Sequence, residues 1–146
     1  DAIRAALMDG TIDALVSDHT PVDADAKNLP FAQAEPGASS LELLLGLALK
    51  WGRELKLPLP HTLASVTSRP GALLGPALGS LAASMGKLTE GAVADLCVFD
   101  AQASAPVNPA ALVSQAKHTP FVGSELPGRV AYTLVGGQVA FEARPR

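Results

Sequence analysis

The sequence predicts an α/β fold in which a buried strand and apolar helices precede a small sheet. Residues 12–17 form a short apolar run that stops at an aspartate, which is typical of a strand covered on both faces in a parallel sheet. Residues 41–51 are apolar nearly all round, which indicates a helix buried on several sides. From Gly86 onward, apolar residues alternate as they do in strands. We therefore expect two units, residues 1–84 and residues 85–146.

The first elements lead directly to a candidate functional residue. Residues 3–8 have helical spacing, and the Asp-Gly pair after them is a typical end of a helix, because glycine accepts a left-handed cap. The predicted strand 12–17 then delivers Asp18 to its carboxyl end, the edge at which parallel sheets carry function. Residues 19–38 show no clear periodicity, and a loop this long inside a compact domain is typically functional or disordered.

A helix is expected from Ser40 to about residue 55. The spacing of Ser39 and Glu42 fits a capping box, in which the serine hydroxyl bonds the backbone at Glu42 and the carboxylate reaches back. Lys50 and Arg53 then indicate a solvated end. A buried helix with its own cap is therefore predicted directly after the loop.

Prolines divide the rest of the first unit. Pro58 and Pro60 precede a predicted helix over residues 61–68, and the Arg-Pro-Gly triplet at 69–71 is expected to stop it. Residues 72–84 are rich in Gly, Ala and Leu. They are predicted to be a linker with one short helical turn.

The second unit is predicted to contain one strand and one hairpin. Residues 93–99 alternate in the manner of a strand. Residues 130–141 form two apolar runs around a Gly-Gly pair, which is typical of a two-residue hairpin turn. Residues 101–126 carry several prolines and are expected to be mostly loop, with a short helix near residues 109–114.

Composition and charge exclude several classes of function. The 146 residues supply one core or a piece of a larger one, and the start at Asp1 rather than Met suggests a fragment or a processed product. A net charge of -3 with scattered basic residues argues against nucleic acid or a membrane surface as partner. The longest apolar run, residues 43–49, is too short to span a bilayer. The single Cys97 is expected to be buried, in a protein of the reducing cytoplasm.

Asp18 is the main candidate for chemistry. An aspartate at the end of a buried strand can bind a metal, act as a general base or cap the following turn, and the residues alone leave these roles open. His19 is expected to support the loop. His61 and His118 lie far apart in the sequence and are expected at the surface.

Two stretches resemble dihydroorotases, a family of the amidohydrolase superfamily. Ser17-Asp18-His19-Thr20-Pro21, followed by Glu35-Pro36-Gly37-Ala38-Ser39-Ser40-Leu41-Glu42, is similar to a family pattern of approximately Asp-His-Ala-Pro-His and then Pro-Gly-Ile-x-Gly-Leu-Glu. The stretch 86–100 is similar to the return of the superfamily into its small β domain. The likeness covers nearly the whole chain but roughly the last third of such a protein, because a complete barrel needs roughly 250 residues.

The resemblance implies a fold, an activity and a cofactor. Residues 1–84 would be the end of a metal-dependent (β/α)8 TIM-type barrel, and residues 85–146 would be strands and loops of a small β-sandwich-type domain. The reaction would be the reversible conversion of N-carbamoyl-L-aspartate to dihydroorotate in pyrimidine biosynthesis. Asp18 would be both a zinc ligand and the catalytic carboxylate that carries a proton. The other zinc ligands of the family lie upstream, so this chain alone would lack most of the metal site.

The substrate-binding residues that the resemblance implies are only partly present in this chain. Pro36 and Gly37 match a segment whose backbone contacts the substrate ring, although Pro-Gly is equally common in ordinary turns. Val22 stands where the family pattern has a histidine that holds the substrate carboxylate, and valine has neither a donor nor a charge. This departure puts substrate binding in doubt.

Two hypotheses follow from the resemblance. The first is the carboxyl-terminal part of a zinc-dependent dihydroorotase or a related cyclic amidohydrolase, with a small-molecule substrate and a homo-oligomer as expected partners. The second is a catalytically silent dihydroorotase-like protein that supports the assembly of aspartate transcarbamoylase. Asp18 and the Pro36-Gly37 pair favour the enzyme, and Val22 favours the silent protein.

Overall fold

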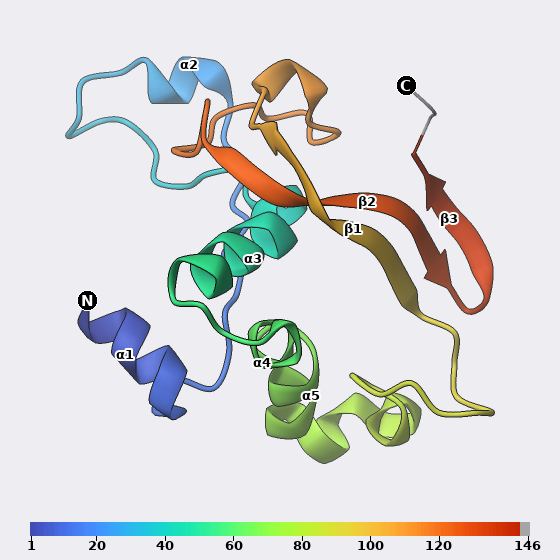
Figure 1. Ribbon diagram of the computed structural model, residues 1–146. Helices are drawn as coiled ribbons and strands as arrows, with labels where there is room; N and C mark the ends of the chain where they lie inside the picture. The colour runs from blue at the N-terminus through green and yellow to red at the C-terminus, as the bar shows by residue number, and fades with distance from the viewer. Residues whose placement is uncertain (144–146) are drawn as a thin grey trace.

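Helices make up the first part of the molecule and a twisted three-stranded sheet the last part (Figure 1). The computed structural model describes residues 1–143. The α-helices are α1 (Ala2–Asp9), α2 (Ala24–Lys27), α3 (Leu44–Glu54), α4 (Leu59–Ala64) and α5 (Ser68–Leu74), and the 3-10 helices are η1 (Leu41–Leu43), η2 (Gly75–Ala83) and η3 (Pro109–Ala111). The strands β1 (Leu96–Pro106), β2 (Glu125–Val135) and β3 (Gln138–Glu142) form an antiparallel sheet in the order β1-β2-β3.

Residues 12–17 are not a strand, so this prediction was wrong. The segment has no assigned secondary structure, and the Leu15 N–H donates to the Ser65 carbonyl oxygen at 2.9 Å. The Val16 side chain is 72% exposed. A strand needs a neighbour that supplies a ladder of hydrogen bonds. Within residues 1–143, the strands of the sheet pair with one another, and none lies beside this segment.

The helix predicted from Ser40 is confirmed as η1 followed by α3, but the predicted capping box is wrong. The Ser39 hydroxyl donates to the carbonyl oxygen of Ala116 at 2.7 Å, and the Glu42 carboxylate accepts hydrogen bonds from the backbone of residues 113–114. Residues 113–116, far along the chain, therefore bind the side chains that a local helix cap would use. Sequence spacing alone does not reveal such a competitor.

The helix predicted over residues 61–68 is divided differently in the structure. α4 ends at Ala64 and α5 begins at Ser68, so the Arg-Pro-Gly triplet lies inside a helix and does not stop one. Pro70 is tolerated because it lies in the first turn of α5, where a backbone N–H has no partner within the helix. The predicted linker 72–84 holds the end of α5 and all of η2, which is interrupted at Gly79.

The predicted hairpin is confirmed, with Val135 paired to Gln138 across the Gly-Gly turn. The strand predicted at 93–99 begins later, at Leu96, and continues through Pro106 into the region that was expected to be loop. The extension is possible because β2 offers pairing partners as far as Glu125, after a register shift that follows Asp100. The short helix expected near residues 109–114 is η3.

Helix α3 packs on β2 and links the two parts of the chain. A Cβ atom on Gly46 would lie 3.0 Å from Leu126 Cβ and 3.1 Å from the Pro127 carbonyl oxygen, so the helix backbone approaches the strand closely. The buried cluster beside this contact consists of Leu43, Val107 and Leu126. The core therefore lies between the helical part and the sheet.

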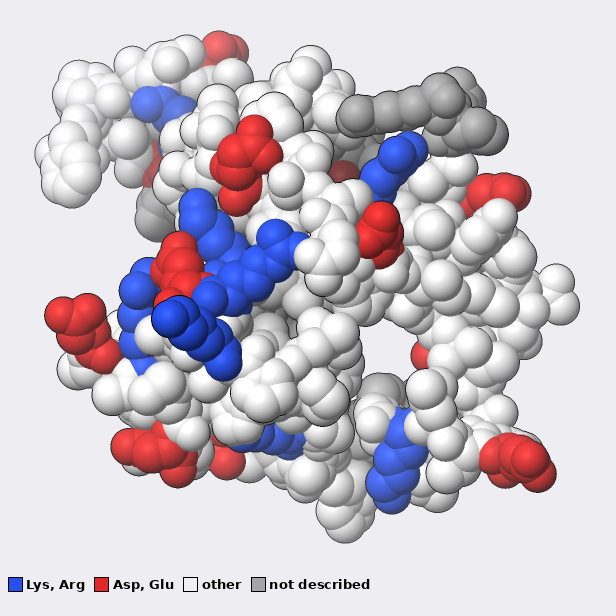
Figure 2. Space-filling model, in the orientation of Figure 1, with Lys and Arg blue, Asp and Glu red and all other residues white. Residues whose placement is uncertain are grey.

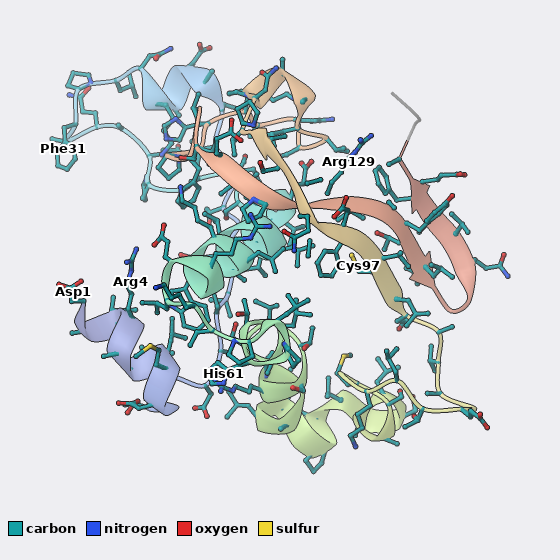
Figure 3. All side chains as sticks on the ribbon, in the orientation of Figure 1. Asp1, Arg4, Phe31, His61, Cys97 and Arg129 are labelled. Atoms are coloured by element: carbon teal, nitrogen blue, oxygen red, sulfur yellow. The ribbon has the colours of Figure 1, made fainter. Side chains whose placement is uncertain are left out.

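The prediction that Cys97 is buried was wrong. The residue is exposed, because the face of β1 on which it lies is not covered by the described part of the chain. Partial desolvation by neighbouring atoms still raises the pKa of the Cys97 thiol. Figure 3 shows Cys97 on β1.

Gly52→Ala is expected to destabilise the protein by about 1–3 kcal/mol, because a Cβ atom there would overlap the buried side chain of Thr62 and push α3 away from α4. Gly71→Ala is the matched control. The nearest atom to its new methyl group would be the flexible Met85 Cγ, 3.0 Å away, and alanine favours the helix. Urea unfolding measures both free energies. Equal stability of Gly52→Ala and Gly71→Ala would contradict the packing described for α3 and α4.

Candidate functional site

Asp18 lies at the neck of a long loop, residues 18–38, which we call the Asp18 loop. The Thr20 N–H donates to the Ala38 carbonyl oxygen at 3.1 Å and closes this neck. Asp18 has a φ of 45°, a left-handed backbone that aspartate tolerates better than most residues. Its side chain is exposed, and no group of residues 1–143 donates a hydrogen bond to its carboxylate. The carboxylate is therefore available to a ligand or a proton.

His19 attaches the neck to the start of the following helix. Its Nδ1 accepts hydrogen bonds from the backbone N–H groups of Ser40, at 3.1 Å, and Leu41, at 3.3 Å. These N–H groups have no partner within the helix, so the imidazole satisfies them. Nδ1 carries no proton in this arrangement, because it acts as the acceptor. This geometry is the supporting role that the sequence predicted for His19.

Val22 and Gly37 meet inside the loop, whereas Pro36 is exposed. Val22 is buried, and a Cβ atom on Gly37 would lie 2.8 Å from Val22 Cγ2 and 2.5 Å from the Thr20 carbonyl oxygen. Gly37 also has a φ of 127°, which favours glycine. Val22 thus helps to hold the two sides of the loop together. The roles in substrate binding predicted for Pro36 and Gly37 stay predictions.

The outer part of the Asp18 loop has its own hydrogen bonds. The Lys27 ammonium group donates to the Glu35 carbonyl oxygen, and the Glu35 N–H donates to the Ala26 carbonyl oxygen at 3.2 Å. Phe31 is 98% exposed and extends away from the rest of the molecule (Figure 3). These contacts give the loop a fixed shape, with an apolar side chain at its tip.

Residues 38–42, which we call the clamp, join the neck to a distant segment. The Ser40 hydroxyl donates to the Ser17 carbonyl oxygen on one side. On the other side, the Ser39 N–H donates to the His118 carbonyl oxygen at 2.8 Å, and the Glu42 carboxylate accepts from residues 113–114. Sequence reasoning missed this contact, because residues 101–126 carry no pattern that assigns them a partner.

Residues 1–143 do not form a metal centre by themselves. Within residues 1–143, no group of three or more His, Cys, Asp or Glu side chains could hold a metal ion. His19 Nδ1 is occupied by two N–H groups, and His118 is exposed, as predicted. His61 is half-buried, contrary to the prediction, because an Arg69 nitrogen lies 3.3 Å from its Nε2. Asp18 can supply one ligand, but residues 1–143 do not gather a complete ligand set around it.

The face that Figure 2 shows carries charged side chains of both signs. Lys and Arg side chains lie among Asp and Glu side chains on the face that Figure 2 shows. None of the helices in residues 1–143 has the length and apolar character needed to cross a bilayer.

Comparison with known proteins finds relatives that match nearly the whole chain. A dihydroorotase-like protein of Pseudomonas aeruginosa is 43% identical over 143 residues, which cover 97% of this chain and 32% of that protein. A dihydroorotase of Geobacter metallireducens is 38% identical over 141 residues, which cover 97% of this chain and 32% of that protein. The predicted resemblance to dihydroorotases is confirmed. The chain spans about a third of the length of these relatives, and no family model matches it.

Solved structures agree with this assignment. A D-hydantoinase (dihydropyrimidinase) from Thermus sp. has a TM-score of 0.83 and 26% identity, and the match covers 97% of this chain and 31% of that chain. An L-hydantoinase (dihydropyrimidinase) from Arthrobacter aurescens has a TM-score of 0.83 and 27% identity, covering 96% and 31%. The predicted α/β class, as part of an amidohydrolase fold, is confirmed. The boundary between residues 84 and 85 stays a prediction.

His19→Leu is expected to destabilise the protein by about 1–3 kcal/mol, because it leaves the N–H groups of Ser40 and Leu41 without an acceptor. His19→Asn is the matched variant, since its amide oxygen can occupy the position of Nδ1. It should retain most of the stability in urea unfolding at pH 8. If asparagine and leucine are equally destabilising, the imidazole does not act as the acceptor described.

Proposed function

We propose that this chain is part of a dihydroorotase-type cyclic amidohydrolase that interconverts N-carbamoyl-L-aspartate and dihydroorotate. The observation that carries the proposal is the presentation of Asp18. Its neighbours Ser17 and His19 are bonded to the clamp, while its own carboxylate is exposed and free of partners among residues 1–143. The sequence likeness to dihydroorotases supports the choice of reaction.

Asp18 would move a proton at the nitrogen of the cyclic amide. In ring closure, the carbamoyl nitrogen bonds to the side-chain carboxyl carbon of the substrate, loses one proton, and water leaves. In hydrolysis, the ring nitrogen regains that proton as its bond to carbon breaks. A carboxylate with unused acceptor positions can hold the proton in one direction and return it in the other. A fixed neck would keep this carboxylate at a constant distance from the substrate.

Zinc is the cofactor that the resemblance implies. Because residues 1–143 do not gather a set of ligands, zinc binding is proposed for the whole protein, with Asp18 contributing one carboxylate. When bound, zinc would act as a Lewis acid. The substrate, the cytoplasmic location and a homo-oligomeric state are likewise proposed for the whole protein.

Val22 favours a second candidate function. Its buried side chain packs on Gly37 and offers no donor to a substrate carboxylate. A hydrogen bond to a charged group contributes on the order of 1.5–3 kcal/mol, so its loss would slow turnover about 10–100-fold. The second candidate is a catalytically silent dihydroorotase-like protein that supports the assembly of aspartate transcarbamoylase.

Asp18→Asn in the whole protein is expected to lower kcat with dihydroorotate by about 100-fold or more, because the amide cannot accept and return the proton. Asp13→Asn makes the same change at an exposed aspartate whose side chain has no hydrogen bond among residues 1–143, and its kcat should match the wild type. Zinc content is measured for each protein. Wild-type kcat in Asp18→Asn would refute the proposed role.

Val22→His is expected to raise dihydroorotate turnover about 10–100-fold, because it adds a donor for the substrate carboxylate. Val22→Leu is the control, since leucine enlarges the side chain without adding a donor. Turnover that is equal in Val22→His and the wild type would show that valine is tolerated. Wild-type protein that is inert and metal-free but co-purifies with aspartate transcarbamoylase would support the silent candidate.

A further inference from the structure

Glu42 is the charged member of the clamp, and none of the proposed chemistry uses it. Its Oε2 accepts a hydrogen bond from the Val113 N–H at 2.9 Å, and its Oε1 accepts one from the Ser114 N–H at 2.8 Å. Both carboxylate oxygens are thus directed at consecutive backbone groups that lie more than seventy positions along the chain. Hydrogen bonds to an ionised acceptor are roughly twice as strong as neutral ones. A pair of them fixes the orientation as well as the distance.

The segment that Glu42 holds has no regular secondary structure of its own. Residues 112–119 contain neither helix nor strand. The remaining bonds between this segment and the clamp involve Ser39, whose N–H donates to the His118 carbonyl oxygen and whose hydroxyl donates to the Ala116 carbonyl oxygen. The Ser39 Oγ also lies 3.5 Å from the Ser114 Oγ. Glu42 and Ser39 together therefore form one short contact with this segment. Without the carboxylate, the N–H groups of residues 113–114 would lose their partners.

The opposite side of the same clamp fixes the residues around Asp18. Ser40 and Leu41 donate their N–H groups to His19 Nδ1, and the Ser40 hydroxyl donates to Ser17. Glu42 follows these residues directly, within η1. Displacement of Glu42 would therefore displace the donors that hold the neck of the Asp18 loop.

Resting on the proposed function, we propose that Glu42 is a positioning residue that couples residues 113–118 to the neck of the Asp18 loop. It has no hydrogen bond to Asp18 and acts through the clamp. Its carboxylate holds the clamp against residues 113–118 by hydrogen bonds. The clamp in turn holds the Asp18 backbone in its left-handed conformation. The sequence singled out Glu42 as a local helix cap, whereas the structure directs it to a long-range contact.

The test compares Glu42→Gln with wild type in the whole protein. Glutamine keeps the shape of the side chain but removes the charge and replaces one acceptor by a donor. Glu90→Gln is the matched control, because Glu90 is exposed and its side chain has no hydrogen bond among residues 1–143. Amide hydrogen exchange is followed in peptides that contain residues 113–114 and residues 40–41.

Amide exchange in Glu42→Gln is expected to rise on the order of tenfold at residues 113–114 and also at residues 40–41. The kcat for the cyclic amide should fall on the order of tenfold, with little change in KM or in the midpoint of urea unfolding. Glu90→Gln should change none of these quantities. Faster exchange confined to residues 113–114, or kcat equal to wild type in an active protein, would overturn the coupling.

The exchange measurement is independent of activity. If the wild-type protein does not turn over any cyclic amide, the proposed function fails, but exchange at residues 40–41 still decides whether Glu42 controls the clamp. If the wild type is active and exchange at residues 40–41 in Glu42→Gln is unchanged, the function stands and the positioning role is refuted. A large fall in unfolding midpoint without a fall in kcat would assign Glu42 a purely structural role.

Discussion

The structure depends on one short polar contact, in which the clamp is hydrogen-bonded on both of its sides. Its serine and backbone donors reach Ser17 and His19 at the neck of the Asp18 loop, and Glu42 reaches residues 113–114. Backbone groups in an irregular segment must find partners, and here side chains of the clamp supply them. The same residues therefore close a loop and attach it to the second half of the chain.

Close packing of α3 against β2 makes that contact possible. Gly46 lets the backbone of α3 approach Leu126 and Pro127 of β2. Gly128 of β2 lies against the side chain of Leu49 of α3. Because the clamp leads directly into η1 and α3, the sheet determines where the clamp lies. The Asp18 loop is thus positioned by a helix-to-sheet contact that involves no residue of the loop itself.

The sequence predicted what depends on local patterns and missed what depends on distant partners. The hairpin at Gly136-Gly137 and the helix after Ser40 were correct, because turn chemistry and apolar periodicity are local. The strand at residues 12–17 was not found, because a strand requires a neighbour. Asp18 became a candidate from its place after an apolar run, and its role stays a prediction. The long-range contact of Glu42 could not be predicted from spacing that also fits a capping box.

The proposed mechanism requires the clamp to present Asp18 to the nitrogen of a cyclic amide. A crystal structure of the whole protein with dihydroorotate bound tests it most directly. We expect a carboxylate oxygen of Asp18 within about 3 Å of the ring nitrogen, with the bonds from the clamp to Ser17 and His19 intact. An Asp18 side chain directed away from a bound substrate, while those bonds persist, would refute the mechanism.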